Sequence, residues 1–456
     1  MKRLIFIGLD GVGLDLAQGL AAAGVMPNLG RLMDLAGAWA TASPLPEVSP
    51  VCWTTLFSGH APGGHGVYGF GEHLPGTYAV APVDAGAVRV ARIWQRASRA
   101  GRRTVVLNVP LTYPAEPLNG VMVSGFVTPE LGRGVHPPEL LPRLTALGYR
   151  PEADLDRGVA DPAALAPDLL AALEARLALF TELLAQPWNL YIAVFTETDR
   201  VNHFLWPALA DAAHPLAGPA REVYRRIDAF IGRVWEAHAP AVQAGELALL
   251  IAADHAFGPI VSEVYLNPWL RQEGWLTAEG WEAGPGHERI LPKTAALALD
   301  PGRVYLHWAD RFPGGWLRPG AQADELAERI RAGLLALRYQ RISPGPDGRP
   351  RLAAEAPIAR VHRGRELYRG PQAGLAPDLV AVAAPGYSLR AGMGRAGVFG
   401  QSHLTGAHRP QGGLALMLPP PDARPAELSG LHGLMAGVLG LDRTVRLDLP
   451  GPPLLG

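Results

Sequence analysis

Arg3-Leu4-Ile5-Phe6-Ile7-Gly8-Leu9-Asp10, near the start of the chain, is a run of apolar residues that ends in a carboxylate. A continuous apolar run of this length is typical of a β-strand that is buried on both faces, as in a parallel sheet. Four other runs have the same character. The runs expected to form strands are Arg3 to Leu9, Thr104 to Asn108, Asn189 to Phe195, Leu247 to Ala253 and Asp378 to Ala383.

Stretches with the apolar spacing of amphipathic helices lie between these strands. They are Pro27 to Ala36, Val88 to Ala100, Ala163 to Leu184, Ala220 to Ala237 and Ala321 to Leu337. Strands that alternate with helices predict an α/β layered fold with a mostly parallel central sheet. Ligands of such folds bind at the carboxyl ends of the strands, so the residues after each strand are the first candidates for a site.

The composition is that of a folded globular protein. The chain has 456 residues, of which 48% are hydrophobic and 18% are charged. This length is enough for one large domain or two ordinary ones. The 41 basic and 42 acidic side chains give a net charge of −1, and the basic residues are not clustered. We therefore expect no nucleic-acid partner, because phosphate neutralisation needs clustered cations.

Neither a membrane anchor nor a disulfide framework is indicated. The first apolar run is broken by Asp10 too early for a signal peptide, and no uninterrupted run reaches the ~18 residues of a transmembrane helix. We expect a cytoplasmic protein without a membrane partner. The one cysteine, Cys52, cannot form an internal disulfide or a thiolate cluster, so any metal must be held by histidines and carboxylates.

Three of the predicted strands run into potential metal ligands. Asp10 ends the first strand, Asp199 and His203 follow the third, and Asp254-His255 follows the fourth. Carboxylate oxygen and imidazole nitrogen are both ligands of divalent transition metals. The alternative interpretation is structural, since Asp begins turns and caps helices and a single His is common on a surface. Asp199 and His203 lie four apart and would share one face if a helix begins near Thr198.

Ser49 is the candidate nucleophile. It precedes Pro50, which predicts a helix with Ser49 as its N-cap, and Gly59 would end that helix. The free amides at a helix start also stabilise an anion, and a neighbouring metal would activate the hydroxyl. Under the structural alternative Ser49 is only a cap. Cys52 is the rival nucleophile, but its place beside Trp53 inside the helix favours core packing.

A series of short motifs runs along the chain in a fixed order. They are Gly8-Leu9-Asp10-Gly11, Ser49 ahead of Trp53-Thr54-Thr55 and Ser58-Gly59, Pro62-Gly63-Gly64-His65-Gly66, Asp199 to His203, Asp254-His255 and Gly406-Ala407-His408-Arg409-Pro410. In this order they resemble the alkaline phosphatase superfamily, and most of all its type I phosphodiesterase/nucleotide pyrophosphatase-like branch of predicted phosphohydrolases or phosphomutases. The resemblance covers nearly the whole chain. It implies an alkaline-phosphatase-like three-layer sandwich with an inserted cap subdomain.

The resemblance also implies two divalent metal ions. Asp10, Asp254 and His255 would hold one ion together with the Ser49 oxygen, while Asp199, His203 and His408 would hold the other. Zinc is the expected metal and Mn²⁺ is the alternative. His403, five residues before His408, is the alternative ligand. The implied activity is hydrolysis of phosphate esters, with phosphodiester or nucleotide pyrophosphate bonds favoured, through a phosphoserine on Ser49.

One departure from that branch concerns the substrate. After His65-Gly66-Val67 those enzymes usually carry an Asn that helps to bind the phosphoryl oxygen, and Phe70 stands near that place here. Asn108 is the candidate substitute as a substrate-binding residue. The partner is expected to be a small phosphate ester or nucleotide. The alternatives are a phosphomonoesterase or phosphomutase of the same superfamily, or a non-catalytic metal-binding homologue. The sequence does not indicate the oligomeric state.

The expected domain organisation follows from the spacing of the ligands. The long interval between His255 and His408 predicts an inserted cap or specificity subdomain at 261–369. The metal-dependent core would then comprise 1–260 and 370–456, with a second, small insertion at about 127–162. Loops and insertions over a fixed scaffold commonly set specificity, so both insertions are expected to do so here.

Overall fold

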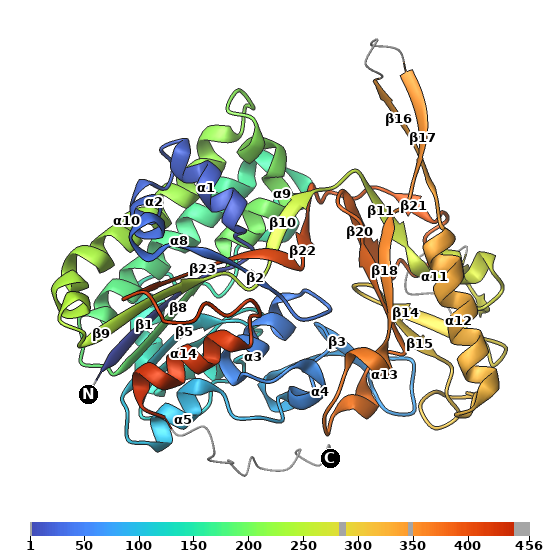
Figure 1. Cartoon of the computed structure of the whole chain (residues 1–456), viewed down its shortest axis with the longest axis horizontal. Helices are drawn as coiled ribbons and strands as arrows, with labels where there is room; N and C mark the ends of the chain where they lie inside the picture. The colour runs from blue at the N-terminus through green and yellow to red at the C-terminus, as the bar shows by residue number, and fades with distance from the viewer. Residues whose placement is uncertain (1, 282–288, 345–349, 442–456) are drawn as a thin grey trace. The chain divides into compact units, whose positions relative to one another are not determined.

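The apolar run Arg3–Leu9 forms β1, a central strand of an eight-stranded sheet (Figure 1). The computed structural model describes residues 2–281, 289–344 and 350–441. The order of the strands in this sheet is β2-β23-β9-β1-β8-β5-β6-β7. The five strands from β9 to β6 are parallel to one another, whereas β23, β2 and β7 are antiparallel to their neighbours. The other strands of the sheet are β2 (Trp39–Ala42), β5 (Thr104–Val109), β6 (Gly120–Ser124), β7 (Val135–His136), β8 (Leu190–Phe195), β9 (Leu247–Ala252) and β23 (Gln411–Leu418).

Helices cover both faces of the sheet, which makes the predicted three-layer sandwich. Because side chains alternate along a strand, Ile5 and Ile7 of β1 pack on one face and Leu4 and Phe6 on the other. The first face is covered by α1 (Leu14–Ala22), α2 (Pro27–Ala36), α8 (Pro162–Leu184), α9 (Glu197–Ala210) and α10 (Ala217–Gln243). The second face is covered by α3 (Ser49–Ser58), α5 (Ile93–Arg99) and α14 (Gly430–Leu439).

The chain divides into two compact units. The first comprises the residues up to Val67, Val83–Phe257 and the chain from His408 onward, and it contains the eight-stranded sheet. The second comprises Tyr68–Pro82 and Gly258–Ala407. The assignment of an inserted segment at 261–369 as a cap that sets specificity stays a proposal.

The second unit is built around a four-stranded antiparallel sheet with the order β14-β15-β19-β18. These strands are β14 (Ala296–Leu299), β15 (Arg303–Leu306), β18 (Ile358–Arg363) and β19 (Leu379–Ala383), and α12 (Ala321–Ala336) contributes to the same apolar core. The run Asp378 to Ala383 therefore forms a strand, but the prediction that it is a parallel strand of the main sheet is wrong. A short apolar run is typical of any strand that is buried on both faces. It does not determine which strands pair with it or whether the pairing is parallel.

Smaller elements also belong to the second unit. They are β3 (Gly71–His73), β4 (Val80–Pro82), β11 (Ser262–Tyr265), α11 (Leu266–Gln272), β12 (Ala278–Glu279), β13 (Arg289–Ile290), β16 (Tyr339–Pro344), β17 (Pro350–Glu355), α13 (Gly364–Leu367), β20 (Tyr387–Arg390) and β21 (Phe399–Gly400). Two further strands, β10 (Ala256–Pro259) and β22 (Gly406–Arg409), pair with each other. Their pairing matters for the site, because β10 directly follows Asp254-His255 and β22 carries His408.

The predicted helices form, with one shortened at its start. The helix expected over Val88 to Ala100 begins only at Ile93, because Arg92 is extended and its backbone N–H is capped by the side chain of Gln95. The predicted small insertion at 127–162 lies in the first unit and supplies β7 and two short helices, α6 (Leu141–Ala146) and α7 (Leu155–Ala160). Across the described residues, every helix is too short or too polar to cross a membrane.

Candidate active site

Four of the predicted ligands come together where three neighbouring parallel strands end. Asp10 follows β1, Asp254 and His255 follow β9, and Asp199 lies in the first turn of α9 after β8. Each of these four side chains is at most 2% exposed. Buried carboxylates and imidazoles are rare without a partner, so the interpretation of these residues as turn formers, caps or surface groups is disfavoured.

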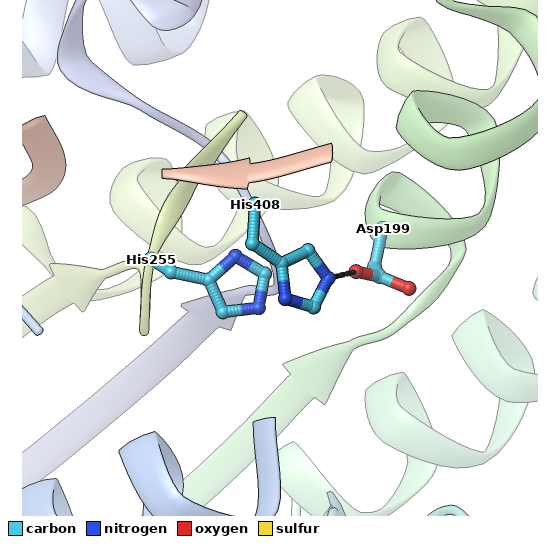
Figure 2. Close-up of side chains that lie close together, drawn as sticks. All are labelled: Asp199, His255 and His408. Carbon is cyan, nitrogen blue, oxygen red and sulfur yellow. Dashed lines mark ion pairs between the residues drawn. The ribbon is translucent and has the colours of Figure 1, made fainter. Parts of the chain in front are cut away.

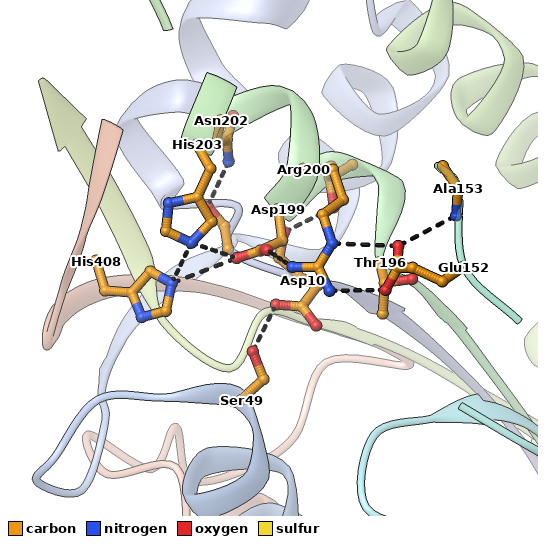
Figure 3. A network of polar contacts seen from close by, with 12 residues as sticks. Asp10, Ser49, Glu152, Ala153, Thr196, Asp199, Arg200, Asn202, His203 and His408 are labelled. Carbon is orange, nitrogen blue, oxygen red and sulfur yellow. Dashed lines mark hydrogen bonds and ion pairs between the residues drawn. The ribbon is translucent and has the colours of Figure 1, made fainter. Parts of the chain in front are cut away.

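The Ser49 hydroxyl points into this cluster. Ser49 Oγ lies 3.2 Å from Asp10 Oδ1 (Figure 3). It also lies 3.4 Å from His255 Nε2. Ser49 is the first residue of α3 rather than its N-cap, a position taken by Val48, and its hydroxyl contacts the cluster. The left-handed Gly59 ends the helix as predicted. The serine is thus placed at the start of a helix with its side chain directed at the candidate ligands.

The first triad comprises Asp10, Asp254 and His255. One ligand atom from each lies within 4.8 Å of the other two. Two donors fix the carboxylates: Trp53 Nε1 donates to Asp10 Oδ2 at 3.1 Å, and the Gly11 amide donates to Asp254 Oδ1 at 3.0 Å. The remaining oxygen, Asp254 Oδ2, is buried without a hydrogen-bond partner among the described residues and lies 3.2 Å from His255 Nε2.

The second triad comprises Asp199, His203 and His408. His408 Nε2 lies 2.9 Å from His203 Nε2 and 3.4 Å from Asp199 Oδ1, and His203 Nε2 lies 3.6 Å from the same oxygen. Asp199 and His203 share one face of α9, as their spacing predicts, and β22 brings His408 to them. His403, the alternative ligand, is exposed and belongs to neither candidate metal group in the described chain.

His255 lies between the two triads. Its ring stacks on that of His408 with 3.8 Å between the centroids, and Asp199, His255 and His408 form a second group whose ligand atoms lie within 4.8 Å of one another (Figure 2). The two candidate metal positions are therefore adjacent rather than separate sites.

Backbone carbonyls set the protonation of two imidazoles. His408 Nδ1 lies 2.7 Å from the Glu47 carbonyl oxygen, and His255 Nδ1 lies 3.3 Å from that of Ala256. A carbonyl can only accept a hydrogen bond, so Nδ1 carries the proton in each neutral ring. The lone pair of each Nε2 then faces the cluster, which is the arrangement found in metal-bound histidines.

Burial opposes the charged forms of Asp10, Asp254 and His255. Burial, together with the charges of Asp254 and Asp199, raises the pKa of Asp10 well above its usual value, and burial raises that of Asp254 to about 7. Burial and the neighbouring His408 hold the pKa of His255 well below its usual value. Burial opposes ionisation of Asp199 too, but His203, His408 and Arg200 keep its pKa low.

These features fit two divalent cations. Two buried carboxylate oxygens, Asp199 Oδ1 and Asp254 Oδ2, have no hydrogen-bond partner in the described chain, and each faces at least one imidazole nitrogen. Two nitrogens that bind one tetrahedral zinc lie about 3.3 Å apart, close to the separation of His203 and His408. The donor set of oxygen and nitrogen without sulfur suits Zn²⁺ and also admits Mn²⁺. The predicted division into two ligand triads, with Ser49 beside the first, stays a proposal that this geometry supports.

Asn108, the predicted substrate-binding residue, is fully buried. Its side-chain amide donates to the Val194 carbonyl at 2.8 Å and lies 3.3 Å from Thr196 Oγ1. Its φ of 57° is the left-handed backbone of a turn. A phosphoryl oxygen would have to displace one of these contacts, so the role of Asn108 stays a prediction without geometric support.

Sequence reasoning assigned no role to several groups that support the site. The Thr198 hydroxyl donates to the Asp10 carbonyl at 2.6 Å, and the Asn202 amide donates to the Gly11 carbonyl at 2.9 Å. Arg200 donates to Asp199. Thr198, Arg200 and Asn202 lie next to the predicted ligands Asp199 and His203 in the sequence. This proximity is the signal that could have identified them. Cys52 is fully buried, as core packing requires, and burial raises the pKa of its thiol well above the usual value.

The parallel sheet, its two helical layers and the acidic and imidazole residues at its carboxyl edge define an alkaline-phosphatase-like protein. The chain belongs to the type I phosphodiesterase / nucleotide pyrophosphatase family, whose model matches residues 4–410. Among curated protein sequences, none matches it significantly.

Solved structures agree on the fold. Phosphonoacetate hydrolase from Sinorhizobium meliloti 1021 in complex with phosphonoformate is 16% identical, with a TM-score of 0.60 over 96% of this chain and 95% of that one. An inactive form of murine ectonucleotide pyrophosphatase / phosphodiesterase 5 in complex with AMP is 13% identical, with a TM-score of 0.56 over 98% of this chain and 97% of that one. Identities this low support the fold alone.

Proposed function

We propose that this protein hydrolyses phosphate esters with two divalent cations and forms a phosphoserine intermediate on Ser49, phosphodiester or nucleotide pyrophosphate bonds being the favoured substrates. Family membership supports metal-dependent phosphoester hydrolysis as the general chemistry. The observation that carries the proposal is the place of Ser49 Oγ, which lies 3.2 Å from Asp10 Oδ1 and 3.4 Å from His255 Nε2 at the start of α3.

The residues of the chain divide the work between them. Asp10, Asp254 and His255 would hold one cation, and Asp199, His203 and His408 the other. When bound, the cations supply Lewis acidity and lower the pKa of the serine hydroxyl. Asp10 Oδ1 accepts the hydrogen bond of Ser49 and thereby aims Oγ. The positive end of α3 favours the negative charge of a phosphoryl group beside Ser49.

The reaction would proceed in two displacements. Ser49 Oγ gives up its proton and forms a bond to phosphorus while the bond between phosphorus and the leaving oxygen breaks. The leaving oxygen takes up one proton in exchange, and the group departs as an alcohol or phosphate. Water then attacks the phosphoserine, which releases the phosphate product and regenerates the hydroxyl. The family model supports phosphate esters as the substrate class, so the proposed substrate is a small phosphate ester or nucleotide. Structures of the same fold hold phosphonoformate and AMP, which are small molecules of related chemistry.

Metal content and ester preference test the proposal together. The purified protein would be analysed for bound metal and assayed with bis-p-nitrophenyl phosphate and p-nitrophenyl phosphate, alongside Ser49→Ala and His203→Ala. Two bound metals, and turnover that both substitutions abolish, are expected. Preference for the diester would identify a phosphodiesterase, and preference for the monoester a phosphatase. Turnover unaffected by either substitution would contradict the site assignment.

A further inference from the structure

Arg200 lies next to the ligand Asp199 and has a defined contact for each of its three guanidinium nitrogens. Nη1 donates to Asp199 Oδ2 at 2.6 Å, while Nε and Nη2 donate to the two carboxylate oxygens of Glu152 at 3.2 and 2.8 Å (Figure 3). The Arg200 side chain is only 11% exposed. It therefore bridges two carboxylates, one in the proposed metal site and one outside it.

The Arg200 contact divides the roles of the two oxygens of Asp199. Oδ2 is held by a charge-assisted hydrogen bond, which is about twice as strong as a neutral one. Oδ1 is left without a hydrogen-bond partner among the described residues and faces the Nε2 atoms of His203 and His408. The carboxylate is thus turned so that a single oxygen, Oδ1, faces the two imidazoles.

Glu152 fixes Arg200 from a distant part of the chain. It lies between α6 and α7, in the small insertion at 127–162, 48 residues from Arg200. The Phe126 ring supports the face of the guanidinium, with 4.4 Å between Cζ and the ring centroid. The guanidinium is held by two hydrogen bonds to Glu152, one to Asp199 and the Phe126 ring on its face. Together these contacts specify one orientation of the planar group, which the compact ammonium of lysine cannot reproduce.

We propose that Arg200, oriented by Glu152, is a positioning residue that sets Asp199 as a one-oxygen ligand of the second cation. The inference rests on the proposed function, since it assumes that Asp199, His203 and His408 hold a metal. It adds a role for the insertion at 127–162, which reaches the metal site through this arginine. Loss of a hydrogen-bond partner that orients a metal ligand usually lowers metal affinity about 10- to 100-fold.

Metal affinity measured apart from catalysis tests the inference. Zinc binding to wild type, Arg200→Lys and Glu152→Gln would be measured by competition with a fluorescent chelator, and thermal unfolding of the chelated proteins would check folding. Arg200→Lys is expected to weaken one of two zinc equivalents about 10- to 100-fold, and Glu152→Gln to weaken the same equivalent less. Excess zinc should restore hydrolysis by Arg200→Lys but not by Ser49→Ala.

A matched control lies in the same insertion. Arg143 on α6 pairs with Glu182 at 2.7 Å, but on the surface, where the two side chains are 48% and 38% exposed. Arg143→Lys should bind both zinc equivalents like wild type. If Arg200→Lys also binds both equivalents like wild type, or only lowers the unfolding temperature of the chelated protein, the positioning role is refuted.

The same experiment separates this inference from the proposed function. Retained turnover by Ser49→Ala with weakened zinc binding by Arg200→Lys would refute the phosphoserine mechanism and support the positioning role. Loss of turnover in Ser49→Ala with unchanged affinity in Arg200→Lys would support the mechanism and refute the positioning role. A wild-type chain that binds no divalent cation would overturn both.

Discussion

Replacing Asp254 with asparagine is expected to stabilise the metal-free protein while it removes metal binding by the first triad. Asparagine has the shape of aspartate and keeps the oxygen that accepts the Gly11 amide. Its NH₂ group takes the place of Oδ2, which has no hydrogen-bond partner among the described residues and lies 3.2 Å from the lone pair of His255 Nε2. The substitution thus replaces a buried, unpaired charge with a neutral donor.

The magnitude follows from the pKa of Asp254. Burial raises this pKa from 3.8 to about 7 in the metal-free fold. Between these values the folded state holds a proton that the unfolded state has lost, so stability falls as the pH rises through this window. Each pH unit is worth about 1.4 kcal/mol, so the ionised carboxylate costs on the order of 4 kcal/mol above pH 7, as an upper bound. Asp254→Asn lacks this cost.

Thermal unfolding in the presence of a chelator measures the effect. Asp254→Asn should unfold at a higher temperature than wild type at pH 8 and at nearly the same temperature at pH 4. Added zinc should raise the unfolding temperature of wild type more than that of Asp254→Asn, because a cation stabilises only the fold that binds it. A chelated variant less stable than wild type at pH 8, or one that zinc stabilises as much, would refute the reasoning.

Three further outcomes are expected. Trp53→Phe removes the donor to Asp10 Oδ2 and should weaken zinc binding by about 10- to 100-fold in a chelator competition, since a hydrogen bond to a charged group is worth about 1.5–3 kcal/mol; unchanged affinity would contradict this. Cys52→Ala should lose about 1–3 kcal/mol of stability in denaturant unfolding yet keep its turnover, because burial raises the pKa of the thiol and so disfavours the thiolate that a nucleophile needs. Burial raises the pKa of Asp378 to about 6, so stability should fall by on the order of 2–3 kcal/mol from pH 4 to 6, and Asp378→Asn should flatten this slope in denaturant unfolding.

The spacing of apolar residues along the sequence predicted individual strands and helices. The run Arg3–Leu9 is apolar on both faces and forms β1 with the expected bounds, and α2 likewise has its predicted bounds, Pro27–Ala36. The pairing of strands is a property of the whole chain. The run at Asp378 to Ala383 therefore formed a strand, but in an antiparallel sheet of the second unit.

Some residues of the site were predictable from the ends of strands, whereas others are brought together only by the packing of the whole chain. Asp10 and Asp254-His255 were predictable because parallel neighbouring strands end at one edge of the sheet, where their next residues meet. His408 came from the resemblance, and the structure accounts for its place through the pairing of β22 with β10. No sequence pattern links Glu152 to Arg200, since only the packing of segment 127–162 brings them together.

The proposed function depends on two cations held side by side at the carboxyl edge of the main sheet. Anomalous diffraction at the zinc absorption edge, from crystals grown with zinc, tests this directly. We predict two peaks, one among Asp10, Asp254 and His255 beside Ser49, and one among Asp199, His203 and His408. A single peak, no peak at this edge, or a second peak bound by His403 in place of His408 would contradict the account.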